Sequence, residues 1–277
     1  MVTFTFIRHG QSTDNVKRVW AGWKDAPLSN HGMKQATALG KWFSDKGVHF
    51  TAILSSTLER AATTAEVILT HQPGPHPPHI KSLLLREQHF GSAEGKSWSR
   101  KSYSGATLGE ENCSSGTSTN HSRRGDRFPG GESKKDLSAR AERVIDELLL
   151  PYILNTTGPV PSHVAVVSHG LFIREIVDAL YRREFGGEGL LNNHRGLSNT
   201  GWTKVVVNVK RSIIPPSSPS ASKLDLSVRI TAINEHEHLD NLVRQKGGIG
   251  SLAHDPKQKD IRGFFAGSTG ASASSKS

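Results

Sequence analysis

The sequence predicts an α/β fold: a three-layer αβα sandwich with a largely parallel central sheet and helices on both faces. Strand-like and helix-like segments alternate along the chain, which is typical of strands joined by crossover helices. One strand candidate, residues 163–168, is continuously apolar, and it runs directly into a helical pattern. At 277 residues the chain can also bury a substantial core.

The first strand and helix are predicted from their apolar periods. Residues 2–7 alternate and then meet a turn, which favours a strand. Residues 30–43 place apolar side chains at helical spacing, and Gly47 follows as a stop signal.

The next segments predict a strand, a helix and a second strand. Residues 50–56 form a short buried strand that leads directly into a helix. Ser56 and Glu59 have the S-x-x-E spacing of a capping box, so we expect the helix to begin there. After the proline-rich loop 71–79, residues 80–87 are predicted to form a strand.

The second half repeats the alternation of helices and strands. A helix is expected from Ser133 to about Leu149, because its apolar residues form one stripe. The strand at 163–168 is followed by a helix over 171–183. Two late strands are predicted at 203–210 and 224–234.

We expect residues 1–242 to form one domain. Within it, residues of about 99–127 are rich in Ser, Gly and Thr, without an apolar period, and are interpreted as a low-complexity insertion. Residues 243–277 are rich in Gly, Ser and Lys and are predicted to be a disordered basic tail.

The net charge of +10 invites a nucleic-acid interpretation, but its location argues against one. Residues 96–135 and 243–277 each carry a net +4, so +8 of the charge lies in poorly patterned segments of the solvated kind. The single cysteine, Cys113, excludes an internal disulfide and fits a reducing compartment. With no membrane-length apolar run and no signal-peptide pattern, we expect a cytoplasmic protein, with a nuclear location as the alternative, and no membrane partner.

Unusual polar residues follow several predicted strands. They are Arg8 and His9 after the first, Glu87 after another and His169 after the apolar strand, while Arg60 opens a helix. Each alone is better explained as a structural or solvated side chain. Because ligands of such sheets bind at the carboxyl ends of strands, we expect the five to converge on one rim.

Two histidines, two arginines and one glutamate suit phosphoryl transfer without a metal. Arginines are permanently charged, forked donors for phosphate oxygens. A neutral imidazole among them can attack phosphorus, and a carboxyl group can protonate the departing oxygen and then activate water. Glu87 is the candidate for that carboxyl group.

These motifs resemble those of the histidine phosphatase superfamily, in its phosphoglycerate-mutase-like branch. The matching segments come in the family's order and cover most of residues 2–239: RHGQSTDN, AGWKDAPLSNHGMKQA, SSTLERAATTAE, REQHFGSAEG, FPGGES, VVSHG and NEHEHL.

The resemblance implies His9 as the nucleophile that carries a transient phosphoryl group, and Glu87 as proton donor and acceptor. Arg8, Arg60 and His169 would form the phosphate pocket. The substrate-lining positions implied by it are Gly10, Gln11, Ser12, Asn15, Ala21, Gly22, Gly170 and Leu171. No metal or other cofactor is implied.

Departures from the mutase pattern favour a phosphatase. Gln88 and Phe90 stand where mutases carry Arg and Tyr, Leu171 stands in place of Asn, and Ala21 in place of Thr. Losing these polar groups removes the means of holding a phosphorylated acid for back-transfer. We therefore expect water as the acceptor and a phosphorylated small molecule, of the sugar phosphate or bisphosphate class, as the substrate.

Other functions remain open alternatives. They are a phosphoglycerate mutase, a phosphoprotein phosphatase and a binding module of the same fold; the oligomeric state is unknown. Histidines at 71, 76 and 79 or at 236 and 238 form weak metal candidates, and the insertion's Arg123, Arg124 and Arg127 could contact a second phosphate.

Overall fold

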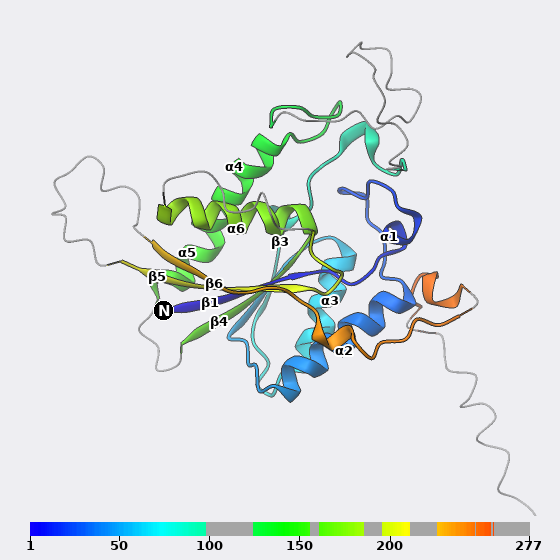
Figure 1. The fold of residues 1–277 in the computed structure, drawn as a ribbon, viewed down its shortest axis with the longest axis horizontal. Helices are drawn as coiled ribbons and strands as arrows, with labels where there is room; N and C mark the ends of the chain where they lie inside the picture. Colours follow the sequence, from blue (N-terminus) through cyan, green and yellow to red (C-terminus); the bar gives the residue numbers. More distant parts are fainter. Residues whose placement is uncertain are drawn as a thin grey trace, which may run out of the picture.

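The computed structural model describes residues 1–97, 124–155, 161–185, 196–210, 226–246, 248–255 and 257. Their six strands form one sheet in the order β3-β2-β4-β1-β5-β6 (Figure 1). β3, β2, β4 and β1 are parallel neighbours, and β5 is antiparallel to both β1 and β6. The strand bounds are β1 Val2–Arg8, β2 Ala52–Ser56, β3 His79–Ser82, β4 Ser162–Ser168, β5 Trp202–Val209 and β6 Leu226–Glu235.

Helices cover both faces of this sheet (Figure 1). On β1 the apolar side chains divide between the faces, because successive residues of a strand point to opposite sides. Phe4 and Phe6 pack with the helices α4, α5 and α6, whereas Ile7 packs with α2 and α3. The predicted three-layer sandwich is therefore confirmed. The helix bounds are α1 Thr13–Lys17, α2 Asn30–Asp45, α3 Glu59–Thr70, α4 Lys134–Val144, α5 Leu150–Leu154 and α6 Gly170–Phe185.

The parallel strands place their carboxyl ends at one edge of the sheet. Arg8 at the end of β1 is in register with Ser168 at the end of β4, and β4 in turn neighbours β2, which ends at Ser56. The expected rim is therefore formed by the residues that follow these three strands.

Two local predictions were wrong, and a third was right about where its helix begins. Ser56 and Glu59 form no capping box: Leu58 is the N-cap of α3, Ser56 Oγ accepts from the Leu58 amide, and Asp25 takes the Glu59 amide. The strand predicted over 80–87 is only β3, because Ser82 caps a 3-10 turn at Leu83–Leu85. The helix expected from Ser133 does begin there, with a capping box, but passes through a π-helical turn, Ile145–Leu149, before α5.

The part of the predicted tail that the structure describes is not detached. The amide of Asn30 donates to Leu252 and the amide of His254 donates to Leu28, so residues 249–254 bond to the start of α2. The prediction of a disordered tail from residue 243 onward was therefore wrong for residues 249–254, because their backbone groups form hydrogen bonds with the domain. Most of the predicted insertion, residues 99–123, lies outside the described residues. In the described part of the chain, no helix has the length and apolarity needed to span a membrane.

Candidate active site

His9 is the buried centre of the site, immediately after β1. Its Nδ1 is 2.7 Å from the carbonyl oxygen of Gly10, so Nδ1 carries the proton and Nε2 keeps its lone pair. The side chain is 4% exposed. Burial and the nearby charges of Arg60 and Arg8 hold the pKa of His9 well below 6.5. The imidazole is therefore neutral near pH 7, as a nucleophile must be.

His169, which follows β4, lies beside His9 with ring centroids 5.0 Å apart. Its Nε2 is hydrogen-bonded to Ser56 Oγ at 2.9 Å, and its Nδ1 has no partner among the described residues. Burial, followed by the charge of Arg60, also holds the pKa of His169 well below 6.5. Ser56 thus positions His169 instead of capping α3.

Arg8 and Arg60 lie near His9 and His169, and each guanidinium group uses some of its N–H groups to bind backbone carbonyls. Arg8 Nη1 donates to the carbonyl of Leu197, and Arg60 donates to the carbonyls of Gly22 and Lys24. The Nε atoms of both arginines are buried and lack partners among the described residues. Burial lowers the pKa of each guanidinium, and the charge of Glu87 partly offsets this. Unpaired buried donors are costly, and an anion would supply the acceptors that these two atoms lack.

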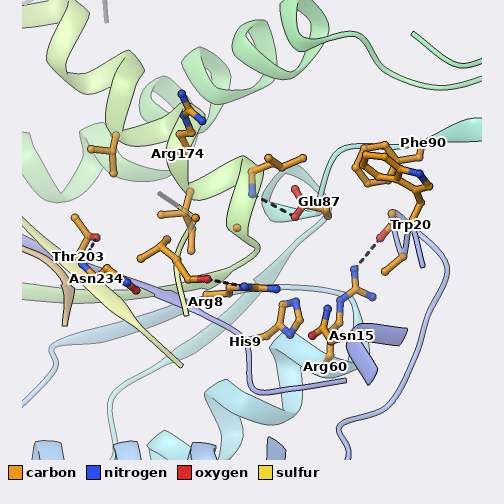
Figure 2. A pocket seen from close by; sticks show the side chains of 18 of the residues that line it. Arg8, His9, Asn15, Trp20, Arg60, Glu87, Phe90, Arg174, Thr203 and Asn234 are labelled. Carbon is orange, nitrogen blue, oxygen red and sulfur yellow. Dashed lines mark hydrogen bonds between the residues drawn. The ribbon is translucent and has the colours of Figure 1, made fainter. Parts of the chain in front are cut away.

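Glu87 faces the same cavity from the loop after β3 (Figure 2). Its carboxylate accepts from three backbone amides: Gln88 at 2.9 Å, Phe172 at 3.2 Å and Leu171 at 3.3 Å. The last two are at the N-terminus of α6, where the helix dipole favours a negative charge. These bonds fix the orientation of the carboxyl group within the cavity.

The cavity above His9 has a volume of about 470 Å³. Its lining includes most of the sequence-predicted residues: Arg8, His9, Asn15, Ala21, Gly22, Arg60, Glu87, Gly170 and Leu171. Asn15 accepts, through Oδ1, from the Ser12 amide and the Asn199 side chain. The structure therefore brings these residues together, while their roles with a substrate stay predictions.

Gly10, Gln11 and Ser12 are absent from the described lining. A Cβ on Gly10 would stand 2.5 Å from the carbonyl oxygen of Gly32, so this glycine lets α2 approach β1 closely. The Gln11 amide donates to Gln35, and Ser12 caps α1. Their hydrogen bonds hold the loop that carries His9, and contact with a substrate stays a prediction for them.

Most of the chain matches the sequence model of one protein family. The sequence model of the histidine phosphatase superfamily (branch 1) matches residues 4–213. This chain belongs to the histidine phosphatase superfamily. That family is the one indicated by the resemblance of the motifs.

Relatives of this chain include phosphoglycerate mutases. A 2,3-bisphosphoglycerate-dependent phosphoglycerate mutase of Neisseria meningitidis is 39% identical over 90 residues, 32% of this chain and 40% of that protein. The chain therefore aligns with less than half of that mutase. A mutase of the same kind from Bradyrhizobium is 33% identical over 188 residues, covering 67% of this chain and 83% of its own.

Solved structures with this fold include phosphatases. A mycobacterial glucosyl-3-phosphoglycerate phosphatase in complex with VO3 superposes with a TM-score of 0.61 at 21% identity, over 84% of this chain and 99% of its own. A putative alpha-ribazole-5'-P phosphatase from Escherichia coli gives a TM-score of 0.58 at 22% identity, over 84% of this chain and 97% of its own. At these identities the likeness establishes the shared fold.

Four of the five histidines in the weak metal candidates have other partners. His79 is hydrogen-bonded to Ser55, and His71 to the carbonyl of Val67. His236 bonds to the carbonyl of Asn234, and His238 to Thr200. Among the described residues, no group of three His, Cys, Asp or Glu side chains could hold a metal ion.

Sequence reasoning missed Arg140, which organises the loop that carries Glu87. Its guanidinium donates to the carbonyls of Leu84, Arg86 and Glu87 and pairs with Glu132 at 2.7 Å. The available signal was its position three residues after Leu137, on the apolar stripe of α4, where a solvated charge is out of place.

Replacing Arg140 with leucine is expected to lower the free energy of unfolding by about 3 to 5 kcal/mol, because it leaves the largely buried Glu132 carboxylate without its counter-charge and removes a charged donor from three carbonyls. Urea unfolding at pH 7 measures this loss. The control is Arg143→Leu in the same helix, whose ion pair with Glu147 is exposed and whose loss costs about 0.5 kcal/mol or less. Equal losses in the two variants would contradict the role given to Arg140.

Proposed function

We propose that this histidine phosphatase hydrolyses phosphomonoesters of small molecules through a phosphohistidine at His9, without a metal ion. The observation that carries the proposal is the set of buried donors around His9. Arg8 Nε, Arg60 Nε and His169 Nδ1 lack partners within the described residues. Arg8 and Arg60 line the pocket, and His169 lies beside His9. A phosphoryl group supplies the oxygens that these donors need.

In the first step, His9 Nε2 attacks phosphorus and the bond between phosphorus and the ester oxygen breaks. The electron pair of that bond goes to the departing oxygen, which takes a proton from Glu87 in its acid form. The product alcohol leaves, and the phosphoryl group stays on Nε2. The two arginines stabilise the charge on the phosphoryl oxygens, which is the main source of rate enhancement in phosphoryl transfer.

In the second step, the Glu87 carboxylate accepts a proton from a water molecule as that water attacks phosphorus. The bond between phosphorus and Nε2 breaks, and its electron pair returns to the imidazole. Inorganic phosphate leaves, and Glu87 is again in its acid form. Two permanent positive charges from arginine take the place that metal ions have in other phosphoryl-transfer sites.

The positions that separate this chain from mutases support water as the acceptor. Gln88 is turned away from the pocket, with its side chain donating to the carbonyl of Glu132. Phe90 and Leu171 present apolar groups to the lining, and Ala21 presents a methyl group. A phosphoglycerate would find few of the polar partners that keep it bound for back-transfer.

The expected sugar phosphate or bisphosphate stays within the proposed substrate class, with monophosphates favoured over bisphosphates. Two of the arginines considered for a second phosphate are engaged: Arg124 donates to Glu175 at 2.9 Å, and Arg127 lies 3.6 Å from Asp136. Arg123 lies outside the described residues. Solved proteins of this fold bear phosphatase names for esters of different alcohols, which supports hydrolysis as a use of the fold.

The acceptor is tested by product analysis. When 3-phosphoglycerate is supplied with a bisphosphoglycerate primer, we expect released inorganic phosphate to exceed 2-phosphoglycerate. Phosphorus NMR distinguishes the two products, and parallel reactions with EDTA are expected to run at the same rate. Efficient isomerisation would establish a mutase, and strong inhibition by EDTA would contradict the metal-free mechanism.

A further inference from the structure

The side of the pocket next to Glu87 is lined by aromatic and apolar side chains. Trp20 and Phe90 come from separate loops, and their ring centroids are 4.6 Å apart at an angle of 54°. Phe128 meets the Trp20 ring edge-on at 5.9 Å and supports it. In Figure 2 the two labelled rings lie together beyond Glu87. We call Trp20, Phe90 and Leu171 the apolar shelf.

Leu171 completes the shelf from the first turn of α6. Its side chain is 39% exposed, although its backbone amide is bonded to Glu87. An exposed leucine beside a catalytic carboxyl group loses contact with water when a ligand covers it, which stabilises an apolar ligand. Phe90, by contrast, is 6% exposed and forms the floor of the shelf.

Polar side chains near the shelf point elsewhere. Gln88 is bonded to Glu132, and His89 stacks on Trp23 at 4.7 Å with its Nε2 3.6 Å from Glu94. Of the three residues that follow Glu87, the polar Gln88 and His89 therefore point away from the pocket, and Phe90 lines it. A sugar with many hydroxyl groups would lose water there without gaining hydrogen bonds from these residues.

The chemistry decides which part of a substrate meets the shelf. Glu87 must contact the ester oxygen to protonate it, so the alcohol attached to that oxygen extends past Glu87. On the Arg8 side of the cavity, the backbone amide of Asn234 already donates to the hydroxyl of Thr203. That side faces the arginine and not the acid, so the leaving group is directed to the shelf.

We propose that the apolar shelf binds the leaving group and that the preferred substrates are monophosphate esters of alcohols bearing a planar, apolar group. This inference rests on the proposed hydrolase and narrows its substrate class. An ester whose alcohol carries a flat ring belongs to it, whereas glucose 6-phosphate does not. Offset or tilted contacts with Trp20 and Phe90 favour such rings beyond simple burial.

The test compares 2-phenylethyl phosphate with glycerol 3-phosphate, which both release a primary alcohol and so differ little in intrinsic reactivity. The ratio of their kcat/KM values, measured in one preparation, is independent of the fraction of folded enzyme. We expect the wild type to favour 2-phenylethyl phosphate by about tenfold or more. Trp20→Phe should keep most of this ratio, and Trp20→Gln, of similar length but polar, should bring it toward one.

Trp42→Phe, on α2, is the matched control and should change neither the ratio nor the activity. A wild-type ratio of one or less, or a Trp20→Gln ratio equal to that of the wild type, overturns the inference while leaving the hydrolase intact. If neither ester is hydrolysed and no phosphohistidine forms, the proposed function fails and the inference fails with it. The two failures are thus distinguishable.

Discussion

Replacing His9 with alanine is expected to reduce kcat/KM for p-nitrophenyl phosphate by about 10⁴-fold or more, because loss of a nucleophile removes the covalent path altogether. The pocket retains its arginines and Glu87, so substrate binding should persist. Phosphate release, followed over a range of substrate concentrations, measures the loss. Rapid acid-free quenching of the wild type during turnover should trap one phosphoryl group, and the variant should trap none.

His76→Ala is the matched control, since His76 is exposed in the loop before β3. It should retain wild-type activity, which shows that removing a histidine as such is harmless. Thermal unfolding of the His9 variant should remain cooperative, because alanine at a strand end leaves the hydrogen bonds of the sheet intact. Undiminished turnover in a folded His9→Ala protein would refute the phosphohistidine mechanism and would favour direct attack by water.

The fold was predictable because its signals are local in the sequence. An apolar strand such as β4 and an amphipathic helix such as α2 each show their period within a short window. Because strands and helices alternate along the chain, the helices are expected to pack as layers on the two faces of the sheet. The boundaries were less predictable where tertiary contacts override local signals. Ser56 illustrates this, because His169 and the Leu58 amide use the hydroxyl that the S-x-x-E pattern assigned to a cap.

The site was predictable as far as its residues follow strands. Sheet geometry brings the ends of β1 and β4 into register, so Arg8 and His169 had to meet. Arg140 could not be found in this way, because its partners are backbone carbonyls of a loop about 55 residues earlier. Every residue has a backbone carbonyl, so no residue type in the sequence indicates such a partner. The same holds for Glu94, which accepts from the amides of Trp23 and Lys24 and so fixes the loop that holds Arg60.

Replacing Glu87 with glutamine is expected to lower kcat/KM for an alkyl phosphate by about 10² to 10⁴-fold, because the amide cannot donate the proton that an alkoxide needs. For p-nitrophenyl phosphate the loss of kcat/KM should be much smaller, since p-nitrophenolate leaves without a proton. Glutamine keeps the shape of the side chain, and its carbonyl oxygen can take the place of Glu87 Oε1, which accepts from the amides of Gln88 and Phe172. Steady-state rates on the two esters, measured side by side, test this difference.

The dependence on the leaving group is what separates acid catalysis from a structural role. A variant that merely loosened the loop would slow both esters equally, because the arginines and His9 would be misplaced for each. Glu66→Gln supplies the control: this exposed glutamate pairs with Lys81 on the surface, and its loss should change neither rate. Equal losses for both esters would assign the acid to another residue.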